Sequence, residues 1–150
     1  DTAFKKFTHA VTQFDPNNSW INYCGKVPYA QLHEYYKDAD MGVFASSCEN
    51  MPNILLETMA SGLPVVCSNM GPMREVLGDA GLYFAPESPE EIANAIRTFL
   101  LSAELRSTKS KQSFAKAKTF NWEVCADETC KFLISILNNP RNRDDINCEF

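Results

Sequence analysis

The sequence lacks several features that would assign it to other protein classes. No hydrophobic stretch approaches the roughly 18 residues that a membrane-spanning helix needs. Positive charge is not in excess, since 14 Lys and Arg face 19 Asp and Glu for a net charge of −5. Nucleic-acid-binding domains usually carry a basic surface, so we expect no nucleic-acid partner. The first residues, DTAFKKFTHAV, lack the apolar core of a signal peptide. We therefore expect an ordinary globular protein.

Support for metal or thiol chemistry is also weak. The six cysteines form no Cys-x-x-Cys pair, which disfavours zinc and thioredoxin-type sites, and we expect no metal. Cys24, Cys48 and Cys67 lie in or beside apolar runs, where a thiol packs as a small hydrophobic group. We expect reduced core cysteines, with disulfides as the alternative. The two histidines, His9 and His33, are expected at the surface or partly packed, the alternative being a catalytic Cys–His pair.

Short apolar segments alternate with helical patterns along most of the chain, which has enough residues for one domain with a core. Such alternation predicts parallel strands joined by helical crossovers, and therefore an α/β fold with a doubly wound, Rossmann-like parallel sheet. A strand buried on both faces should be short and apolar, as 41–46 is. We expect strands at 20–25, 41–46, 64–68 and 81–85, with helices at 2–14, 28–40, 52–62, 72–78 and 88–102.

The last third of the chain is expected to be helical. Residues 103–119 form a basic amphipathic pattern and 121–139 form another helical pattern. The basic face within 106–120 is expected to be solvated, with contact to acidic lipid as the alternative. We expect one domain over residues 1–138 and a polar tail over 139–150.

Ligands of such sheets bind beyond the carboxyl ends of the strands, which here are followed by 25–28, 46–53 and 68–72. Pro52 is suited to the first helical position, which makes Met51 the approximate N-cap. The N–H groups of the first turn then lack partners within the helix, and the helix dipole adds positive charge. The start of this helix is thus a predicted anion site, suited to phosphate.

Two glutamates flank this predicted anion site. Glu57 stands on an otherwise apolar helix, four residues after Asn53, and a buried carboxylate is costly without partners. The two hydroxyls of a sugar diol could supply them, as ribose does in dinucleotide-binding folds. Glu49 precedes the helix, on the far side of the anion. The layout fits a nucleoside diphosphate sugar. The alternative is that Glu49 is merely an acid favoured at a helix start and that Glu57 faces solvent.

The residues around these glutamates also carry a family resemblance. Ala45-Ser46-Ser47-Cys48-Glu49 is followed after seven residues by the run Glu57-Thr58-Met59-Ala60-Ser61-Gly62-Leu63-Pro64-Val65-Val66. This resembles the Pro-Ser-x-x-Glu and Glu-Ala-Met-Ala-x-Gly-x-Pro-Val-Val segments of the group 1 (family 4) retaining glycosyltransferases of the GT-B type. The similarity is to their C-terminal, nucleotide-sugar-binding domain and spans about residues 19–137, including FNW at 120–122.

The resemblance implies a role for each matched residue. Glu49 would contact the donor sugar near the reacting centre, and Glu57 would bind the ribose hydroxyls. The backbone between them would hold sugar hydroxyls and the diphosphate. The loop 25–27 would line the nucleobase, with a simple turn as its alternative. Apart from the two glutamates, the implied donor-binding residues are Asn50, Met51, Pro52, Asn53, Ile54, Gly25, Lys26 and Val27. No cofactor is implied, and a UDP-sugar is the default donor.

The sequence also departs from the family pattern. Asn50 stands where Gly is frequent, and Ala45 stands in place of a proline. The cationic strand that opens the family's domain is not found before 20–25, so we expect it, and an N-terminal domain of the same enzyme, to be supplied elsewhere. The resemblance then implies sugar transfer to an acceptor glycan or lipid-linked saccharide, in the cytoplasm or peripherally at the inner face of a membrane. The alternatives are an isolated nucleotide-sugar-binding fragment without turnover, and an epimerase or phosphorylase on the same scaffold.

Overall fold

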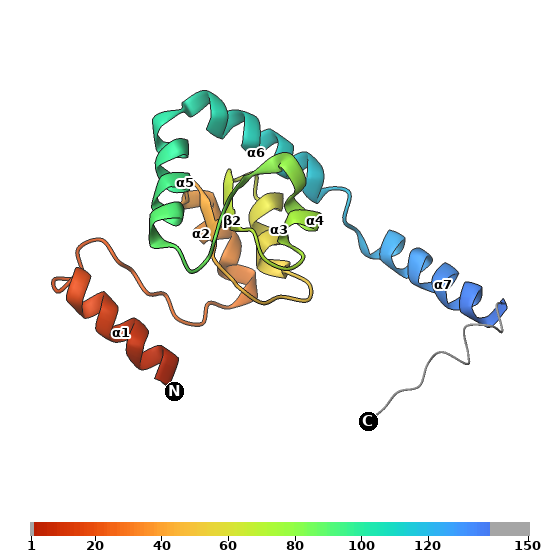
Figure 1. The fold of residues 1–150 in the computed structure, drawn as a ribbon, viewed down its shortest axis with the longest axis horizontal. Helices are drawn as coiled ribbons and strands as arrows, with labels where there is room; N and C mark the ends of the chain where they lie inside the picture. The colour runs from red at the N-terminus through yellow and green to blue at the C-terminus, as the bar shows by residue number, and fades with distance from the viewer. Residues whose placement is uncertain (1, 139–150) are drawn as a thin grey trace. The chain divides into compact units, whose positions relative to one another are not determined.

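The computed structural model describes residues 2–138, and the chain divides into two compact units at the boundary between Tyr35 and Tyr36 (Figure 1). The predicted tail at 139–150 lies outside the described residues. The proposed domain boundary at residue 138 therefore stays a prediction.

The first unit opens with helix α1 (Thr2–Phe14), as predicted, and a tight turn follows it. The carboxylate of Asp15 is buried in this turn and accepts hydrogen bonds from the backbone N–H groups of Ser19, Trp20 and Ile21 and from the Ser19 hydroxyl. Burial alone would raise the pKa of Asp15, but these four hydrogen bonds together hold that pKa well below its usual range. The turn is thus built around an ionised carboxylate.

The prediction of a strand at 20–25 is wrong, because this segment forms no strand in the structure. A strand needs a partner for its ladder of hydrogen bonds, and none of the described strands pairs with it. Tyr23 instead packs against two aromatic rings of α1, with ring centroids 5.1 Å from Phe7 and 5.7 Å from Phe4. The predicted helix at 28–40 is present as a 3₁₀ turn, η1 (Tyr29–Gln31), followed by α2 (Leu32–Asp38).

The second unit contains a parallel sheet, as the sequence predicts. Strands β1 (Gly42–Phe44), β2 (Val65–Ser68) and β3 (Leu82–Phe84) lie in the order β1-β2-β3. Both pairings are parallel. All four residues of β2 are buried. The expectation that 41–46 is buried on both faces is wrong, since Val43 is 48% exposed. The reason is that β1 lies at the edge of the described sheet.

Helices cover both faces of this sheet, which makes it doubly wound (Figure 1). On one face, Val65 and Cys67 of β2 pack against α3 (Asn53–Ala60), α4 (Met73–Leu77) and α6 (Ala103–Ala117). On the other face, Val66 packs with α5 (Pro89–Leu101). The alternation of side chains along β2 therefore divides the core in two. A 3₁₀ turn, η2 (Gly78–Ala80), leads into β3.

Serine side chains cap the starts of α5 and α6. The Ser88 hydroxyl accepts a hydrogen bond from the N–H of Glu91 at the start of α5, as a capping box requires. The Glu91 carboxylate accepts from the N–H of Ala85 at 2.8 Å, rather than from the N–H of Ser88. Its reach across the turn joins β3 to α5. Ser102 caps α6 in the same way, accepting from the N–H of Leu105.

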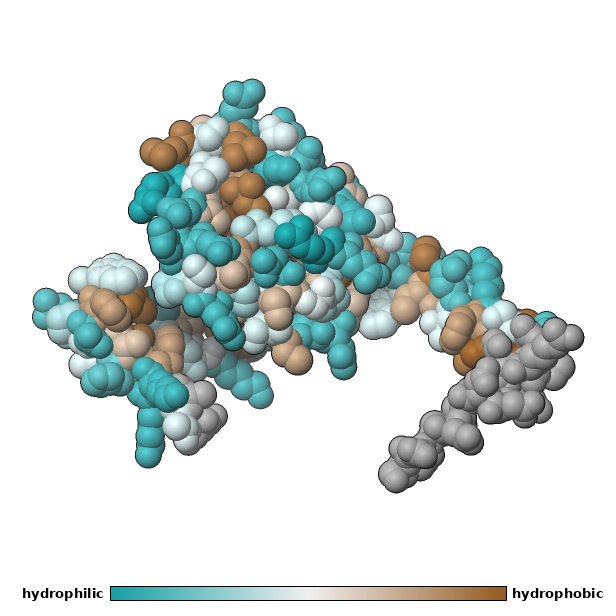
Figure 2. All heavy atoms as spheres, in the orientation of Figure 1, coloured by the Kyte–Doolittle hydropathy of each residue, from teal (hydrophilic) through white to brown (hydrophobic). Residues whose placement is uncertain are grey.

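Helices α6 and α7 confirm the predicted helical C-terminal segment. Lys109 and Ser110 fasten α6 to the rest of the unit by donating to the backbone carbonyls of Asp79 and Gly62. Helix α7 (Trp122–Asn138) has no buried residue, and apolar side chains stand at its surface (Figure 2). Across residues 2–138, no helix has the length and apolar character needed to cross a bilayer.

The cysteine prediction is only partly right. Cys24, Cys48, Cys67, Cys125 and Cys130 are all free thiols. Only Cys67, on β2, belongs to the core, whereas Cys24 and Cys48 are exposed. Cys24 lies in the segment that forms no strand, and Cys48 lies in the loop after β1, so neither occupies a sheet position. Cys148 lies outside the described residues.

Candidate functional site

The start of α3 differs by one residue from the prediction. Pro52 is the N-cap rather than the first helical residue, and it has φ −80° and ψ 75°. These angles form an inverse γ-turn, in which the N–H of Asn53 donates to the carbonyl of Met51 at 2.9 Å. The Asn53 donor is therefore used within the chain. The Pro52 side chain is buried, which anchors this turn against the core.

Two backbone donors remain open at this helix start. The N–H of Leu56 donates to the carbonyl of Pro52 and begins the helical ladder. For the N–H groups of Ile54 and Leu55, no acceptor is found within the described part of the chain, and no side chain caps the helix. The Ile54 side chain is 61% exposed, so this turn borders solvent. Open donors at the positive end of the helix dipole form a site for an anion.

Glu57 lies one turn further along α3 and is half-buried. Its Oε2 accepts a hydrogen bond from the hydroxyl of Tyr36, with 3.2 Å between the two oxygens. Leu55 and Met59 beside it are fully buried, while Leu56 is half-buried. Ala60 is exposed, because α3 turns that position toward solvent near its end. The alternative in which Glu57 simply faces bulk water does not hold.

Glu49 lies in the loop between β1 and α3 and is half-buried. Its backbone carbonyl is close to Gly71, because a Cβ placed on Gly71 would be 3.8 Å from the Glu49 oxygen. Gly71 has φ +54°, a backbone conformation that glycine adopts without strain. The loops that follow β1 and β2 thus meet at the carboxyl edge of the sheet, where ligands of this fold class bind.

The loop from 50 to 54 connects the two glutamates. Asn50, Met51 and Asn53 are exposed, so their side chains and the open helix start share an accessible surface. Glu49, the open N–H groups and Glu57 lie along one continuous loop and helix. Gly25, Lys26 and Val27 belong to the first unit, where Gly25 has φ +62° and Lys26 is exposed. Their role at a nucleobase stays a prediction.

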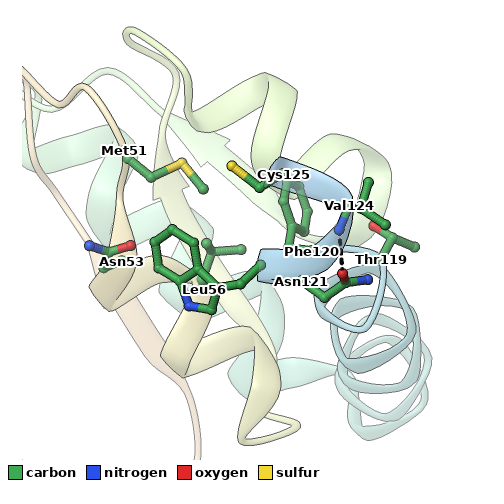
Figure 3. A pocket seen from close by; sticks show the side chains of 9 residues that line it. Met51, Asn53, Leu56, Thr119, Phe120, Asn121, Val124 and Cys125 are labelled. Atoms are coloured by element: carbon green, nitrogen blue, oxygen red, sulfur yellow. Dashed lines mark hydrogen bonds between the residues drawn. The ribbon is translucent and has the colours of Figure 1, made fainter. Parts of the chain in front are cut away.

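A pocket of about 380 Å³, which was not predicted from the sequence, lies beside the start of α3 (Figure 3). Met51 and Asn53 stand on one side and Phe120, Val124 and Cys125 on the other. The α7 side is held by Asn121, whose Oδ1 accepts from the N–H of Val124 at 2.8 Å. The sequence FNW at 120–122, which is part of the family resemblance, was the feature that could have indicated this pocket. The remaining lining residues are Leu56, Thr119 and Trp122.

The pocket is distinct in character from the Glu49–Glu57 segment. Its lining is mostly apolar and shares only Met51 and Asn53 with the predicted donor-binding residues. Across residues 2–138, no group of three or more His, Cys, Asp or Glu side chains is arranged to hold a metal ion. The charged and hydrogen-bonding groups suited to a polar anionic ligand therefore lie at the loop and helix start rather than in the pocket.

Sequence comparison decides the family. A family model described as glycosyl transferases group 1 matches residues 5–102, which is more than half of the chain. The chain belongs to the group 1 glycosyl transferases. Both the loop with Glu49 and helix α3 with Glu57 lie inside the matched region.

Curated members of this family show where the similarity extends. O-antigen chain mannosyltransferase B of Escherichia coli is 38% identical over 110 residues, which is 73% of this chain and 29% of that protein. D-inositol 3-phosphate glycosyltransferase of Corynebacterium glutamicum is 28% identical over 131 residues, covering 86% of this chain and 30% of that protein. The similarity therefore spans about 30% of the length of these two glycosyl transferases.

Solved structures confirm the GT-B fold. HepE of Anabaena, in complex with UDP and glucose, aligns with a TM-score of 0.77 at 21% identity, over 89% of this chain and 36% of that one. The C-terminal domain of a group 1 glycosyl transferase, LpcC, of Francisella tularensis aligns with a TM-score of 0.66 at 23% identity, over 78% of this chain and 62% of that one. The resemblance to a C-terminal domain of a group 1 glycosyl transferase is thereby confirmed.

Proposed function

We propose that the chain is the donor-binding part of a retaining glycosyltransferase, which transfers a hexose from a nucleoside diphosphate sugar to an acceptor glycan or lipid-linked saccharide. The observation that carries the proposal is the open start of α3, where the N–H groups of Ile54 and Leu55 lack acceptors in the described structure. As the bond to the sugar breaks, negative charge grows on the diphosphate. Fixed donors and the helix dipole stabilise that charge more in the transition state than in the substrate.

The two glutamates act on the sugars at either side of the diphosphate. Glu57, half-buried next to the open turn, accepts hydrogen bonds from the ribose hydroxyls. Glu49, at the carboxyl edge of the sheet, holds the donor sugar near the reacting carbon. Asn50, Met51 and Asn53 line the path between them. Gly25, Lys26 and Val27 line the nucleobase. The proposed chemistry uses no metal and no cofactor.

Uridine is our proposed base. HepE, a neighbour in fold, has been solved with UDP and with UDP-glucose, which supports a nucleotide sugar with this base. The mannosyltransferase similarity supports a hexose donor and a place in polysaccharide synthesis. The acceptor-binding groups are proposed to come from an N-terminal domain of the same protein, since the similarity spans only about 30% of the length of the two relatives. An isolated binding fragment without turnover is the alternative, and membership of the family favours the enzyme.

Binding is tested by titrating the chain with UDP, GDP and ADP in a calorimeter. We expect one of them to bind, and we expect Glu57→Ala to weaken it by about tenfold or more, the effect of losing hydrogen bonds to a charged group. The melting temperature should change little. The control is Glu104→Ala, which removes an exposed carboxylate at the start of α6. A large loss of melting temperature with unchanged affinity would make Glu57 structural only.

Turnover is tested in a protein that joins this domain to an acceptor-binding domain. We expect release of nucleoside diphosphate from a nucleotide sugar, and we expect Glu49→Ala to abolish that release while the nucleoside diphosphate still binds. The anomeric configuration of the product, read by proton NMR, should match that of the donor. An inverted product would contradict the retaining mechanism, and undiminished release by Glu49→Ala would contradict the role of Glu49.

A further inference from the structure

Tyr36 lies outside the Glu49–Glu57 segment of the sequence, yet its side chain contacts Glu57. It lies on α2, before β1, and is separated from Glu57 by 21 residues. Its side chain is half-buried, and its hydroxyl donates to Oε2 of Glu57 at 3.2 Å. Helix α2 therefore contributes a polar group to the helix that carries the predicted ribose-binding carboxylate.

The carboxylate of Glu57 keeps capacity for further hydrogen bonds. An ionised carboxylate can accept at about four lone-pair positions. The Tyr36 hydroxyl uses one of them, on Oε2. No second hydrogen bond to this carboxylate is found within residues 2–138. Oε1, and the other side of Oε2, are thus available to two neighbouring hydroxyl groups of a ligand.

The contact also limits how the carboxylate can turn. A free glutamate side chain has several accessible rotamers, and fixing them during binding costs affinity. The hydrogen bond from Tyr36 on α2 restricts the rotamers of Glu57 before the ligand binds. Part of the cost of fixing this side chain is therefore absent from binding. Partners that orient a ligand-binding group in this way act through that group and do not touch the ligand.

We propose that Tyr36 is a positioning residue for nucleotide binding, which holds the Glu57 carboxylate so that it meets both hydroxyls of a ribose diol. This inference rests on the proposed function, in which Glu57 binds ribose. It assigns part of the selectivity for ribonucleotides to α2. Removing the Tyr36 hydroxyl should leave the Glu57 side chain free to adopt other rotamers. The resulting loss of affinity should then occur only for a ligand that has the ribose diol.

The experiment compares two ligands across matched variants. The ligands are whichever of UDP, GDP or ADP binds the wild-type chain most tightly, and the dideoxy analogue of that nucleotide, which lacks both ribose hydroxyls. The variants are Tyr36→Phe, Glu57→Ala and the double variant. Tyr35→Phe is the control, since Tyr35 is the adjacent residue of α2 and is exposed. Dissociation constants are measured by calorimetry, and melting temperatures are recorded for each protein.

We expect Tyr36→Phe to weaken binding of the ribonucleotide by about fivefold, which is the size of effect that one ordinary hydrogen bond has. It should leave the dideoxy analogue unchanged, and it should add no further loss in the Glu57→Ala background. Tyr35→Phe should bind both ligands as the wild type does.

Two results would overturn the inference while leaving the proposed function intact. One is unchanged ribonucleotide affinity in Tyr36→Phe. The other is an equal loss for both ligands, which would show that Tyr36 only supports the fold. If the wild-type chain binds none of the three nucleoside diphosphates, the proposed function fails, and the inference fails with it. Because each comparison is a ratio between two ligands on one protein, a modest loss of stability in Tyr36→Phe does not obscure the result.

Discussion

The methyl group of Thr58 occupies the space directly over Gly42, where a Cβ on residue 42 would overlap Thr58 Cγ2. Thr58 is buried on α3 and donates from its hydroxyl to the carbonyl of Ile54 at 2.7 Å. The absence of a side chain at Gly42 therefore lets α3 lie close against β1. This contact sets the distance between the helix that carries Glu57 and the strand that leads to Glu49.

We expect Gly42→Ala to lower the free energy of unfolding by about 1–3 kcal/mol, the cost of overpacking a close contact. Urea denaturation followed by circular dichroism measures it. Thr58→Ser removes the overlapping methyl group and keeps the hydroxyl, so the cost of Gly42→Ala should be smaller in that background. Equal costs in both backgrounds would show that Thr58 does not define this contact.

Ser113 offers a stabilising change. Its side chain is fully buried on α6, and its hydroxyl has no hydrogen-bond partner within the described part of the chain. Since an unsatisfied buried hydroxyl costs free energy, we expect Ser113→Ala to raise the free energy of unfolding by about 1 kcal/mol. The matched control is Ser107→Ala, at an exposed position of α6, which should have little effect. A destabilised Ser113→Ala would indicate that the hydroxyl has a partner such as a buried water.

Asp15 should make the first unit sensitive to acid. Hydrogen bonds hold the folded-state pKa of Asp15 below the ordinary value of 3.8, so the unfolded chain takes up the proton first. The contribution of Asp15 to stability is thus present above about pH 4 and is lost as the pH falls further. The fluorescence of Trp20, measured in a Trp122→Phe background, reports on this turn.

The control for the acid transition is Asp15→Asn. This variant should be less stable at pH 7, because the Asn side chain has only one oxygen that can accept hydrogen bonds. Its NH2 group can only donate, so the hydrogen bonds that the second Asp15 oxygen accepted are lost. Its stability should also change less between pH 5 and about pH 3 than that of the wild type. The same substitution at exposed Asp40 should leave the transition unchanged. An identical acid transition in Asp15→Asn would exclude Asp15 as its cause.

Cys67 should be the least reactive of the described cysteines. Burial in the core raises its pKa to about 12, so almost no thiolate is present at pH 8. Cys24, Cys48, Cys125 and Cys130 are exposed. With iodoacetamide at pH 8, site-resolved mass spectrometry should show these four modified and Cys67 protected until urea is added. Rapid modification of Cys67 in the native chain would contradict the packing of β2.

Local sequence patterns were sufficient to predict most of the helices and strands of this fold. The side chains of Ser88 and Ser102 cap the helices that they precede, and Gly62, with φ +73°, follows the end of α3. These features depend on neighbours within a few residues. The open helix start with Glu57 one turn later was also predictable, because it follows from a proline and an apolar run on one helix.

Contacts between distant residues were not predictable in the same way. The segment 20–25 has the composition of a strand, but strand formation depends on a partner elsewhere in the chain, and Tyr23 packs on α1 instead. The contact between Tyr36 and Glu57 joins two helices and has no local signature. The apolar pocket beside Met51 depends on where α7 begins relative to α3. In each case the packing of separate elements determines the outcome.

The most direct test of the account is a crystal structure of the chain with the nucleoside diphosphate that binds it. We expect phosphate oxygens within hydrogen-bonding distance of the N–H groups of Ile54 and Leu55, and the ribose hydroxyls on the Glu57 carboxylate. A nucleotide bound elsewhere, for example with its phosphates in the apolar pocket beside Phe120, would contradict the proposed site.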